Sequence, residues 1–330
     1  MTPRVFLRPH PVFAGLGVRR RFLALSPDEV SFASRGFRDT AARPRFEEIG
    51  RVFLRGYDAA LDDAAPAALA DRLNAVDRPL RGFAFEGAAM SLALLDGLTP
   101  WRRDRLAAFL VGPGAPHVYM VHVGAGWAAA RLPWRSPTPP GPPLDPLLAW
   151  LALDGYGFHQ GYFHPAHFLH SSGHGRDGVT GYASRVFDQG LGRALWFVEG
   201  ADVARVVATL RTFPSVRQPD LWSGVGLAAT YAGGVDLAAL TALRRSSGAF
   251  APHVAQGAAF AAKARQAAAI VTPDTEQAVR ALCGVSTDSA AAIADEMRTA
   301  LLSEGGVPAY EVWRRRVRWA FTHQENRDVG

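Results

Sequence analysis

The sequence predicts an all-α fold. Helix-capping signals recur along the chain, apolar residues recur at helical spacing, and strand signals are few. Of the 330 residues, 48% are hydrophobic and 20% are charged, which is the balance of a globular protein with a substantial core.

Capping residues mark the first expected helix starts. Residues 26–29 (Ser-Pro-Asp-Glu) form a capping box with proline in the first turn. The Thr-Pro pairs at 99–100 and 272–273 repeat this arrangement of a cap followed by proline. The helix that starts at the second pair is expected to end at Gly284, because glycine commonly follows the last helical residue.

Three further helices are expected in the second half of the chain. Asp202 caps one of them, apolar residues recur at helical spacing over residues 287–301, and a helix with a basic face and an apolar stripe follows Pro308. Strand signals are weak, and residues 117–123 give the best of them.

A proline-rich segment divides the chain. Seven prolines lie between residues 133 and 146, so this segment is expected to be an extended surface loop rather than a helix or a central strand. Helices of similar character are expected on both sides. We therefore predict one domain of two related helical halves, about 16–132 and 147–330, joined by the loop.

A weak internal repeat favours related halves. Similar segments with glycine in second place begin at Glu86, Asp154 and Ser223, at spacings of 68 and 69 residues, and a closer copy begins at Gln256. Small residues follow each of them, and small residues let helix backbones approach closely. We interpret the pattern as a duplicated helical pair packed through glycine and alanine faces, although an alanine-rich chain also produces such similarity by chance.

The repeat places four polar residues at equivalent positions. Glu86, Asp154, Ser223 and Gln256 would then line a common cavity, where burial raises the pKa of a carboxyl and suits it to move protons. The alternative is that each side chain caps its own helix or binds a backbone amide.

Two other titratable residues belong to the same copies. His159 stands where the other copies have small residues, and Lys263, the only lysine of the chain, follows the fourth copy. Each is a candidate proton carrier, and the alternative is that each simply reaches solvent.

Five histidines lie between residues 159 and 174, among aromatic residues such as Tyr156 and Phe158. Some of these histidines are spaced so that they could bind zinc, copper or iron from one helical face. No HExxH pattern occurs and Pro165 interrupts the run, so we expect no metal site and a surface or aromatic-packed cluster instead. The aromatic residues suit the wall of a pocket for a flat conjugated ligand, and they suit an ordinary core equally well.

Residues 118–129 imitate a dinucleotide fingerprint, with GxGxxA after the strand-like run. That motif needs a second strand that ends in an acidic residue about 20 positions further on, and the proline-rich segment occupies this interval. No P-loop and no GxSxG elbow occur. The sequence therefore assigns no cofactor.

Charge and cysteine content limit the partners. The net charge of +6 permits nucleic-acid binding without requiring it, and no nucleic-acid partner is expected. Cys283 is the single cysteine, which excludes an internal disulfide. We find no convincing signal peptide or transmembrane run, so the expected location is the cytoplasm. The basic face of the last helix is a solvated face or a peripheral contact with anionic lipid at the inner face of the membrane.

Five ordered motifs resemble signatures of the UnbL family of enediyne gene clusters. They begin at Arg81, His122, Asp154, Asp220 and Gln256, and the similarity extends from about residue 16 to the last helix. These motifs coincide with the repeat positions. They place the catalytic candidates at Glu86, Asp154 and His159. The substrate-binding candidates are His122, Tyr156, Phe158, Trp222, Ser223, Gln256 and Lys263.

The resemblance implies a biosynthetic setting. Similar proteins are encoded beside an iterative polyketide synthase that makes a linear fifteen-carbon conjugated polyene. Their partners are a membrane protein similar to a subunit of ion-pumping oxidoreductases and a large propeller-type repeat protein. The implied function is early maturation of an enediyne core. Two hypotheses follow: an enzyme that isomerises the polyene or assists its desaturation, or a non-catalytic subunit that binds the polyene or acts as a scaffold.

Overall fold

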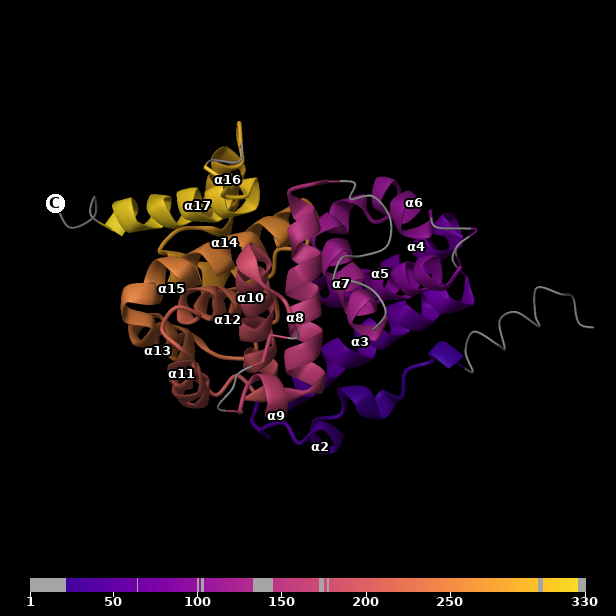
Figure 1. Cartoon of the computed structure of the whole chain (residues 1–330), viewed down its shortest axis with the longest axis horizontal. Coiled ribbons are helices and arrows are strands. Elements are labelled where there is room, and N and C mark those ends of the chain that lie inside the picture. Colours follow the sequence, from indigo (N-terminus) through magenta and orange to yellow (C-terminus); the bar gives the residue numbers. More distant parts are fainter. Residues whose placement is uncertain are drawn as a thin grey trace, which may run out of the picture.

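The computed structural model describes residues 22–63, 65–99, 101, 104–132, 145–171, 175–176, 178–301 and 305–325. Over these residues the protein is helical and contains no β-strand, which confirms the predicted all-α class (Figure 1). The α-helices are α2 (Phe32–Arg35), α3 (Arg43–Asp62), α4 (Pro66–Asn74), α5 (Arg81–Leu98), α6 (Arg105–Val111), α7 (Val118–Arg131), α8 (Leu151–Phe163), α9 (Pro165–Phe168), α10 (Gly181–Val198), α11 (Val203–Thr212), α12 (Gln218–Tyr231), α13 (Leu237–Ser247), α14 (Ala251–Ala267), α15 (Pro273–Cys283), α16 (Thr287–Met297) and α17 (Ala309–Glu325).

Most of the predicted caps are present. Ser26 accepts a hydrogen bond from the N–H of Asp28 at the start of a short 3-10 helix, η1 (Pro27–Val30). Thr272 caps α15, which ends at Gly284 in the left-handed conformation, and Asp202 caps α11. Side-chain oxygens at these positions satisfy N–H groups that the first helical turn leaves without partners.

Two sequence predictions are wrong. Residues 117–123 do not form a strand, because Val118 begins α7. Val121 and Val123 of this run are buried between neighbouring helices, and tertiary packing overrides their local preference for a strand. Thr99 does not start a helix either: it follows the last residue of α5, and the next helix begins at Arg105.

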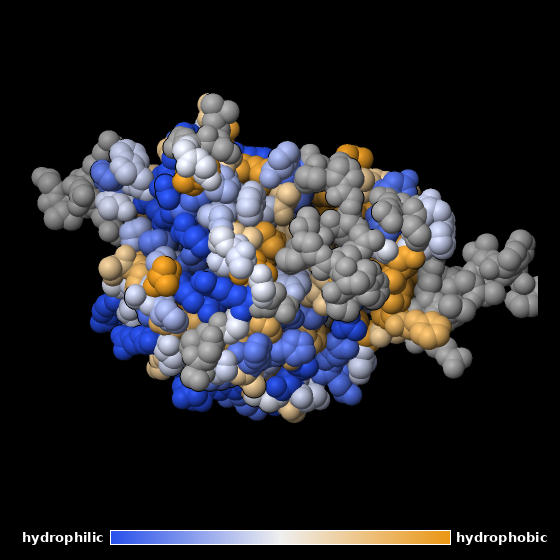
Figure 2. Space-filling view, viewed as in Figure 1, coloured by the Kyte–Doolittle hydropathy of each residue, from blue (hydrophilic) through white to orange (hydrophobic). Residues whose placement is uncertain are grey.

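Seven long helices pack in chain order. The series α3, α5, α7, α8, α10, α12 and α14 places each helix against the next, and α15, α16 and α17 cover α14 (Figure 1). The series curls back on itself and brings α3 close to the end of α12. There, Arg45 of α3 donates a hydrogen bond to the carbonyl of Ala232. Mostly hydrophilic residues cover the face where α11 and α13 lie, as expected for helices that bury one stripe (Figure 2).

Glycines hold successive helices in backbone contact. A Cβ atom at Gly124 of α7 would overlap the carbonyl of Glu86 on α5. Cβ atoms at Gly155 and Gly190 would likewise overlap the carbonyls of Val123 and Asp154, respectively. The same close approach recurs at Gly224 and Gly257. Only residues without a Cβ allow helix axes this close, so the small-residue motifs are packing motifs, and the GxGxxA sequence of α7 belongs to a buried helix.

The two predicted halves meet directly. Residues 133–144 of the proline-rich loop lie outside the described residues. The helices on either side, α7 and α8, pack through Gly126 against Ala152 and through Gly155 against Val123. This contact is of the same kind as the contacts within each half.

The last helix buries more charge than its sequence suggested. The apolar stripe of α17 packs inward, with Trp313 and Val317 fully buried. Arg314 is also fully buried and pairs with Asp220 and Glu311 at 2.8 and 3.3 Å. The basic face therefore turns partly into the protein.

In the part of the chain that the structure describes, no single helix has the length and hydropathy needed to cross a membrane. Residues 105–111 and 115–131 reach those values only together, as a pair of helices bent by 95°.

Candidate functional site

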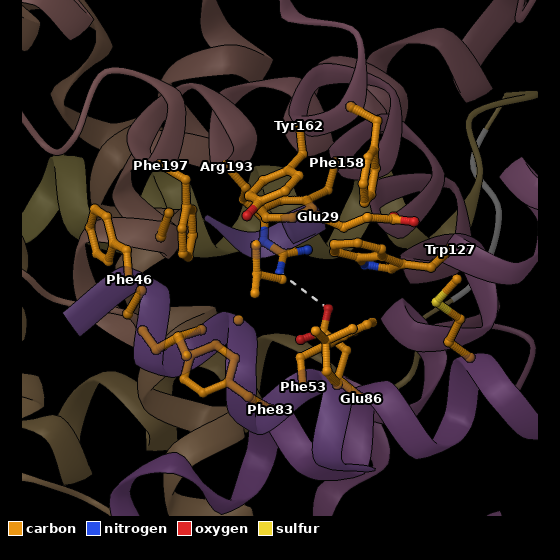
Figure 3. Close-up of a pocket in the computed structure, with 18 of the residues that line it drawn as sticks. Glu29, Phe46, Phe53, Phe83, Glu86, Trp127, Phe158, Tyr162, Arg193 and Phe197 are labelled. Atoms are coloured by element: carbon orange, nitrogen blue, oxygen red, sulfur yellow. Dashed lines mark ion pairs between the residues drawn. The ribbon is translucent and has the colours of Figure 1, made fainter. Parts of the chain in front are cut away.

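A cavity lies inside the curled series of helices. The space between its lining atoms, including the part open to solvent, is about 730 Å³. Helices α3, α5, α7, α8, α10 and α12 supply most of its wall. The wall is largely aromatic, with rings from Phe46, Phe53, Phe83, Trp127, Phe158, Tyr162, Phe163, Phe197 and Tyr231 (Figure 3).

The helices present equivalent positions to this interior. The third residue after the first glycine of each motif lines this cavity or a smaller one of about 430 Å³ beside it. These residues are Met90, Trp127, Phe158, Arg193, Leu227 and Phe260. Arg193 is the only charged member of this set, and with Leu227 and Tyr231 it borders both cavities.

Glu86 and Arg193 face each other inside the aromatic wall. Glu86 projects from α5 and Arg193 from α10, and Nη2 of the arginine lies 3.9 Å from Oε1 of the glutamate (Figure 3). Both side chains are buried. The guanidinium also lies over the ring of Phe158, with its carbon atom 4.9 Å from the ring centroid.

Burial raises the pKa of Glu86 to about 7, and the negative charge of Asp154 adds to the effect. Arg193 and the indole N–H of Trp127 act in the opposite direction and lower this pKa. A carboxyl that exchanges its proton near neutral pH is suited to act as a general acid and a general base.

Asp154 holds Arg193 in place. It is fully buried, forms an ion pair with Nη1 of Arg193, and accepts a hydrogen bond of 2.7 Å from Nε2 of Gln189. The carboxylate borders the smaller cavity and not the aromatic one. We therefore assign Asp154 a positioning role, in which it fixes the guanidinium that faces Glu86.

Four of the residues that precede a first glycine form a buried polar row: Asp154, Gln189, Ser223 and Gln256. Gln189 follows Asp154 in this row, and the Ser223 hydroxyl lies 3.4 Å from Oε1 of Gln189 and 3.0 Å from Oε1 of Gln256. Nε of Arg314 lies 3.3 Å from the same Gln256 oxygen. The structure thus brings Asp154, Ser223 and Gln256 together in a hydrogen-bonded row between helices, and not with Glu86 on the wall of the aromatic cavity.

His159 lies outside both cavities. Its ring meets Trp127 edge to face, with centroids 5.7 Å apart, and packs on Phe163 at 4.5 Å. Burial lowers its pKa to about 3, so the imidazole is neutral near pH 7. Because Trp127 stands on the cavity wall, His159 supports that wall from behind.

Only Phe158 among the predicted substrate-binding residues lines the aromatic cavity. His122 hydrogen-bonds the carbonyl of Val118 on its own helix. Tyr156 packs on Phe187, Trp222 packs on Phe250, and neither lines a cavity.

Lys263 forms an ion pair with Asp295 of α16 at 2.5 Å. The structure therefore places it in a contact between helices, away from the aromatic cavity. No group of three or more potential metal ligands occurs among the described residues, which leave out His174.

A protein-family model matches most of the chain. The model described as "Protein of unknown function (DUF1702)" matches residues 16–321. The chain belongs to the DUF1702 family. No curated protein and no solved structure matches it. The description of the DUF1702 family states no reaction, so the function has to be argued from the site.

Sequence reasoning missed Arg193, although this DUF1702 chain carries a signal for it. Residues 189–192 (Gln-Gly-Leu-Gly) are a further copy of the motif, and the first glycines at 155, 190, 224 and 257 follow one another at 35, 34 and 33 residues. The spacings of 68 and 69 residues skip alternate helices. With this copy included, Arg193 is the single charge at the position that otherwise carries apolar residues.

Proposed function

We propose that this protein binds a linear conjugated polyene in the aromatic cavity and shifts its double bonds by proton transfer through Glu86, during early maturation of an enediyne core. The observation that carries the proposal is the buried carboxyl of Glu86, with a pKa of about 7, on the wall of a mostly aromatic and aliphatic cavity. The resemblance of the five motifs to the UnbL family supports the polyene as ligand.

The chemistry needs no external oxidant. Glu86 gives a proton to one carbon of the conjugated system and takes a proton from another, so the double bonds move while the mass stays the same. Flat rings such as Trp127, Phe158 and Tyr162 suit a flat conjugated chain. Arg193 sets the charge beside Glu86 and therefore its proton affinity.

A carrier without catalysis is the second candidate. One observation favours it: Glu86 faces a guanidinium that is already bound to Asp154, and such a buried ionic arrangement can serve structure alone. In this case the protein holds the polyene and presents it to other proteins.

The setting of the protein belongs to the same proposal. We place it in the cytoplasm or at the inner face of the membrane, acting with the membrane oxidoreductase-like protein and the propeller-type repeat protein that the resemblance implies. Any desaturation step belongs to those partners. Lipid contact through α17 would use Arg315 and Arg316, because Arg314 is buried.

The test is to incubate the purified protein with the linear polyene, without partners, and to follow the absorbance and the mass of the polyene. An isomerase gives a new absorbance spectrum at unchanged mass that persists after extraction. A carrier gives a shifted spectrum that reverts on extraction. Glu86→Gln should still bind the polyene but should not convert it. Failure of the wild-type protein to bind the polyene would refute both candidates.

A further inference from the structure

Three polar atoms on the wall of the aromatic cavity have no hydrogen-bond partner among the described residues. They are Oε1 of Glu86, Nε1 of Trp127 and the hydroxyl of Tyr231. The exposed fractions of the three side chains are 3%, 7% and 4%. Burying a polar atom without a partner costs folding free energy, so native proteins usually supply a partner.

The Tyr231 hydroxyl and the Glu86 side chain lie along one face of α5, and Trp127 lies beside Glu86. The hydroxyl of Tyr231 lies against Gly82, where a Cβ atom would overlap it. Gly82 and Glu86 are four residues apart and therefore adjacent on the same helix face. The Trp127 N–H lies close enough to the carboxyl of Glu86 to lower its pKa, although the two do not reach hydrogen-bond geometry. Because all three residues line the aromatic cavity, a ligand bound there is the candidate partner.

The charges around this point select a neutral partner. The guanidinium of Arg193 is shared between Asp154 and Glu86, so an anion would compete with two carboxyls for it. An anionic head group would also lie beside the carboxyl of Glu86. A neutral oxygen suits Trp127 and Tyr231, because the indole N–H and the phenol O–H are both hydrogen-bond donors.

We propose that the ligand of this cavity is an apolar conjugated chain with one neutral oxygen function, a ketone or an aldehyde. Trp127 and Tyr231 donate hydrogen bonds to this oxygen beside Glu86, and the hydrocarbon part lies along the aromatic wall. This inference rests on the proposed function and names the substrate class more closely.

A bound carbonyl makes the proton transfer balanced and easier. Glu86 as carboxylate removes a proton from a carbon activated by the carbonyl, and the electron pair moves to the oxygen, where the two donors stabilise the enolate. The protonated Glu86 then returns the proton to a more distant carbon of the conjugated system. The product has the same mass and carries its double bonds in new positions.

The experiment compares two probes of equal chain length, a linear tetraene methyl ketone and the corresponding tetraene hydrocarbon. Binding of each is measured by absorbance titration with the wild-type protein, Tyr231→Phe and Trp127→Phe. Ser91→Ala and Thr230→Val serve as controls, because their hydroxyls are also buried and unpartnered among the described residues but do not line the cavity. The ratio of the two dissociation constants cancels changes in cavity shape.

The wild-type protein should bind the ketone about tenfold or more tightly than the hydrocarbon and shift the ketone absorbance to longer wavelength. Tyr231→Phe and Trp127→Phe should lose most of this preference while hydrocarbon binding persists, and both controls should retain it.

Equal binding of both probes by the wild type would overturn the inference and leave polyene binding intact. A loss of preference in the controls as large as in Tyr231→Phe would also overturn it. If neither probe binds, the proposed function fails together with the inference.

Discussion

Nη2 of Arg193 lies 3.9 Å from Oε1 of Glu86, within ion-pair range but beyond a direct hydrogen bond. The same arginine makes its closer contact with Asp154, through Nη1. Glu86 is therefore only partly compensated, and its protonation responds to small changes in the cavity. Several measurable properties depend on this arrangement.

Glu86→Gln should flatten part of the pH dependence of stability. The folded protein raises the pKa of Glu86 from 4.5 to about 7, so folding favours the protonated carboxyl. The contribution of this group to stability is full below pH 4.5 and is lost as the pH rises to about 7. The loss amounts to about 3 kcal/mol.

Urea unfolding at pH 5 and pH 8 measures this effect. The stability of Glu86→Gln relative to the wild type should be greater at pH 8 than at pH 5. If the free energies of unfolding of the two proteins differ by the same amount at both pH values, Glu86 titrates normally in the folded protein.

Asp154→Asn should lower the pKa of Glu86 and destabilise the protein. The charge of Asp154 raises the pKa of Glu86, and its removal leaves Arg193 to pair with Glu86 alone. Removing one partner of a buried pair costs about 3 kcal/mol or more.

The infrared carbonyl band of the protonated carboxyl should show the Glu86 titration at a lower pH in Asp154→Asn. The matched control is Asp295→Asn in the half-exposed pair with Lys263, which should cost about 1 kcal/mol or less. A Glu86 titration at the wild-type pH in Asp154→Asn would contradict the positioning role.

His159→Phe should retain polyene binding and turnover, because the imidazole lies behind Trp127 and lines neither cavity. The pKa of His159 is lowered from 6.5 to about 3, so the wild type loses stability as the pH falls below 6.5. At pH 4 the wild type should have lost about 3 kcal/mol of stability through this group, and His159→Phe should not show this loss. Thermal unfolding at pH 7 and pH 4 checks the stability, and a turnover assay that shows an inactive but folded variant would restore His159 as a catalytic candidate.

Gly224→Ala should destabilise the fold, because its Cβ would overlap the carbonyl of Gln189 on the neighbouring helix. Forcing backbones apart in a packed core costs about 1–3 kcal/mol or more. Gly50→Ala is the comparison, since its Cβ would meet the Cβ of Val30 at 2.5 Å, so the short helix η1 has to shift and not a long helix, and a smaller loss is expected. Denaturant midpoints compare the two, and equal stability of Gly224→Ala and the wild type would refute the close contact.

The sequence allowed prediction of those features that depend on local chemistry. Ser26, Asp202 and Thr272 cap helices because their side-chain oxygens satisfy nearby N–H groups, and neighbours along the chain are enough to show it. Residues 118–123 were assigned to the wrong class because a helix buried on all sides has no amphipathic period.

The candidate site was predictable in part for a similar reason. The motif positions identified Glu86, since burial of a carboxyl follows from its place among small residues. They could not separate Glu86 from Asp154, because only the curl of the helix series decides which of the two faces the aromatic cavity. Arg193 escaped notice because its motif copy lies halfway between the copies that were compared.

The backbone contacts at the glycines affect how the interior of such a protein can evolve. Main-chain atoms set the spacing between the helices, so the dimensions of the scaffold do not depend on the side chains that point inward. Each motif places one residue, three positions after its first glycine, in the lining of one of the two cavities. Replacing these residues one at a time would adapt the interior to a longer, wider or more polar molecule while the framework around it stays the same.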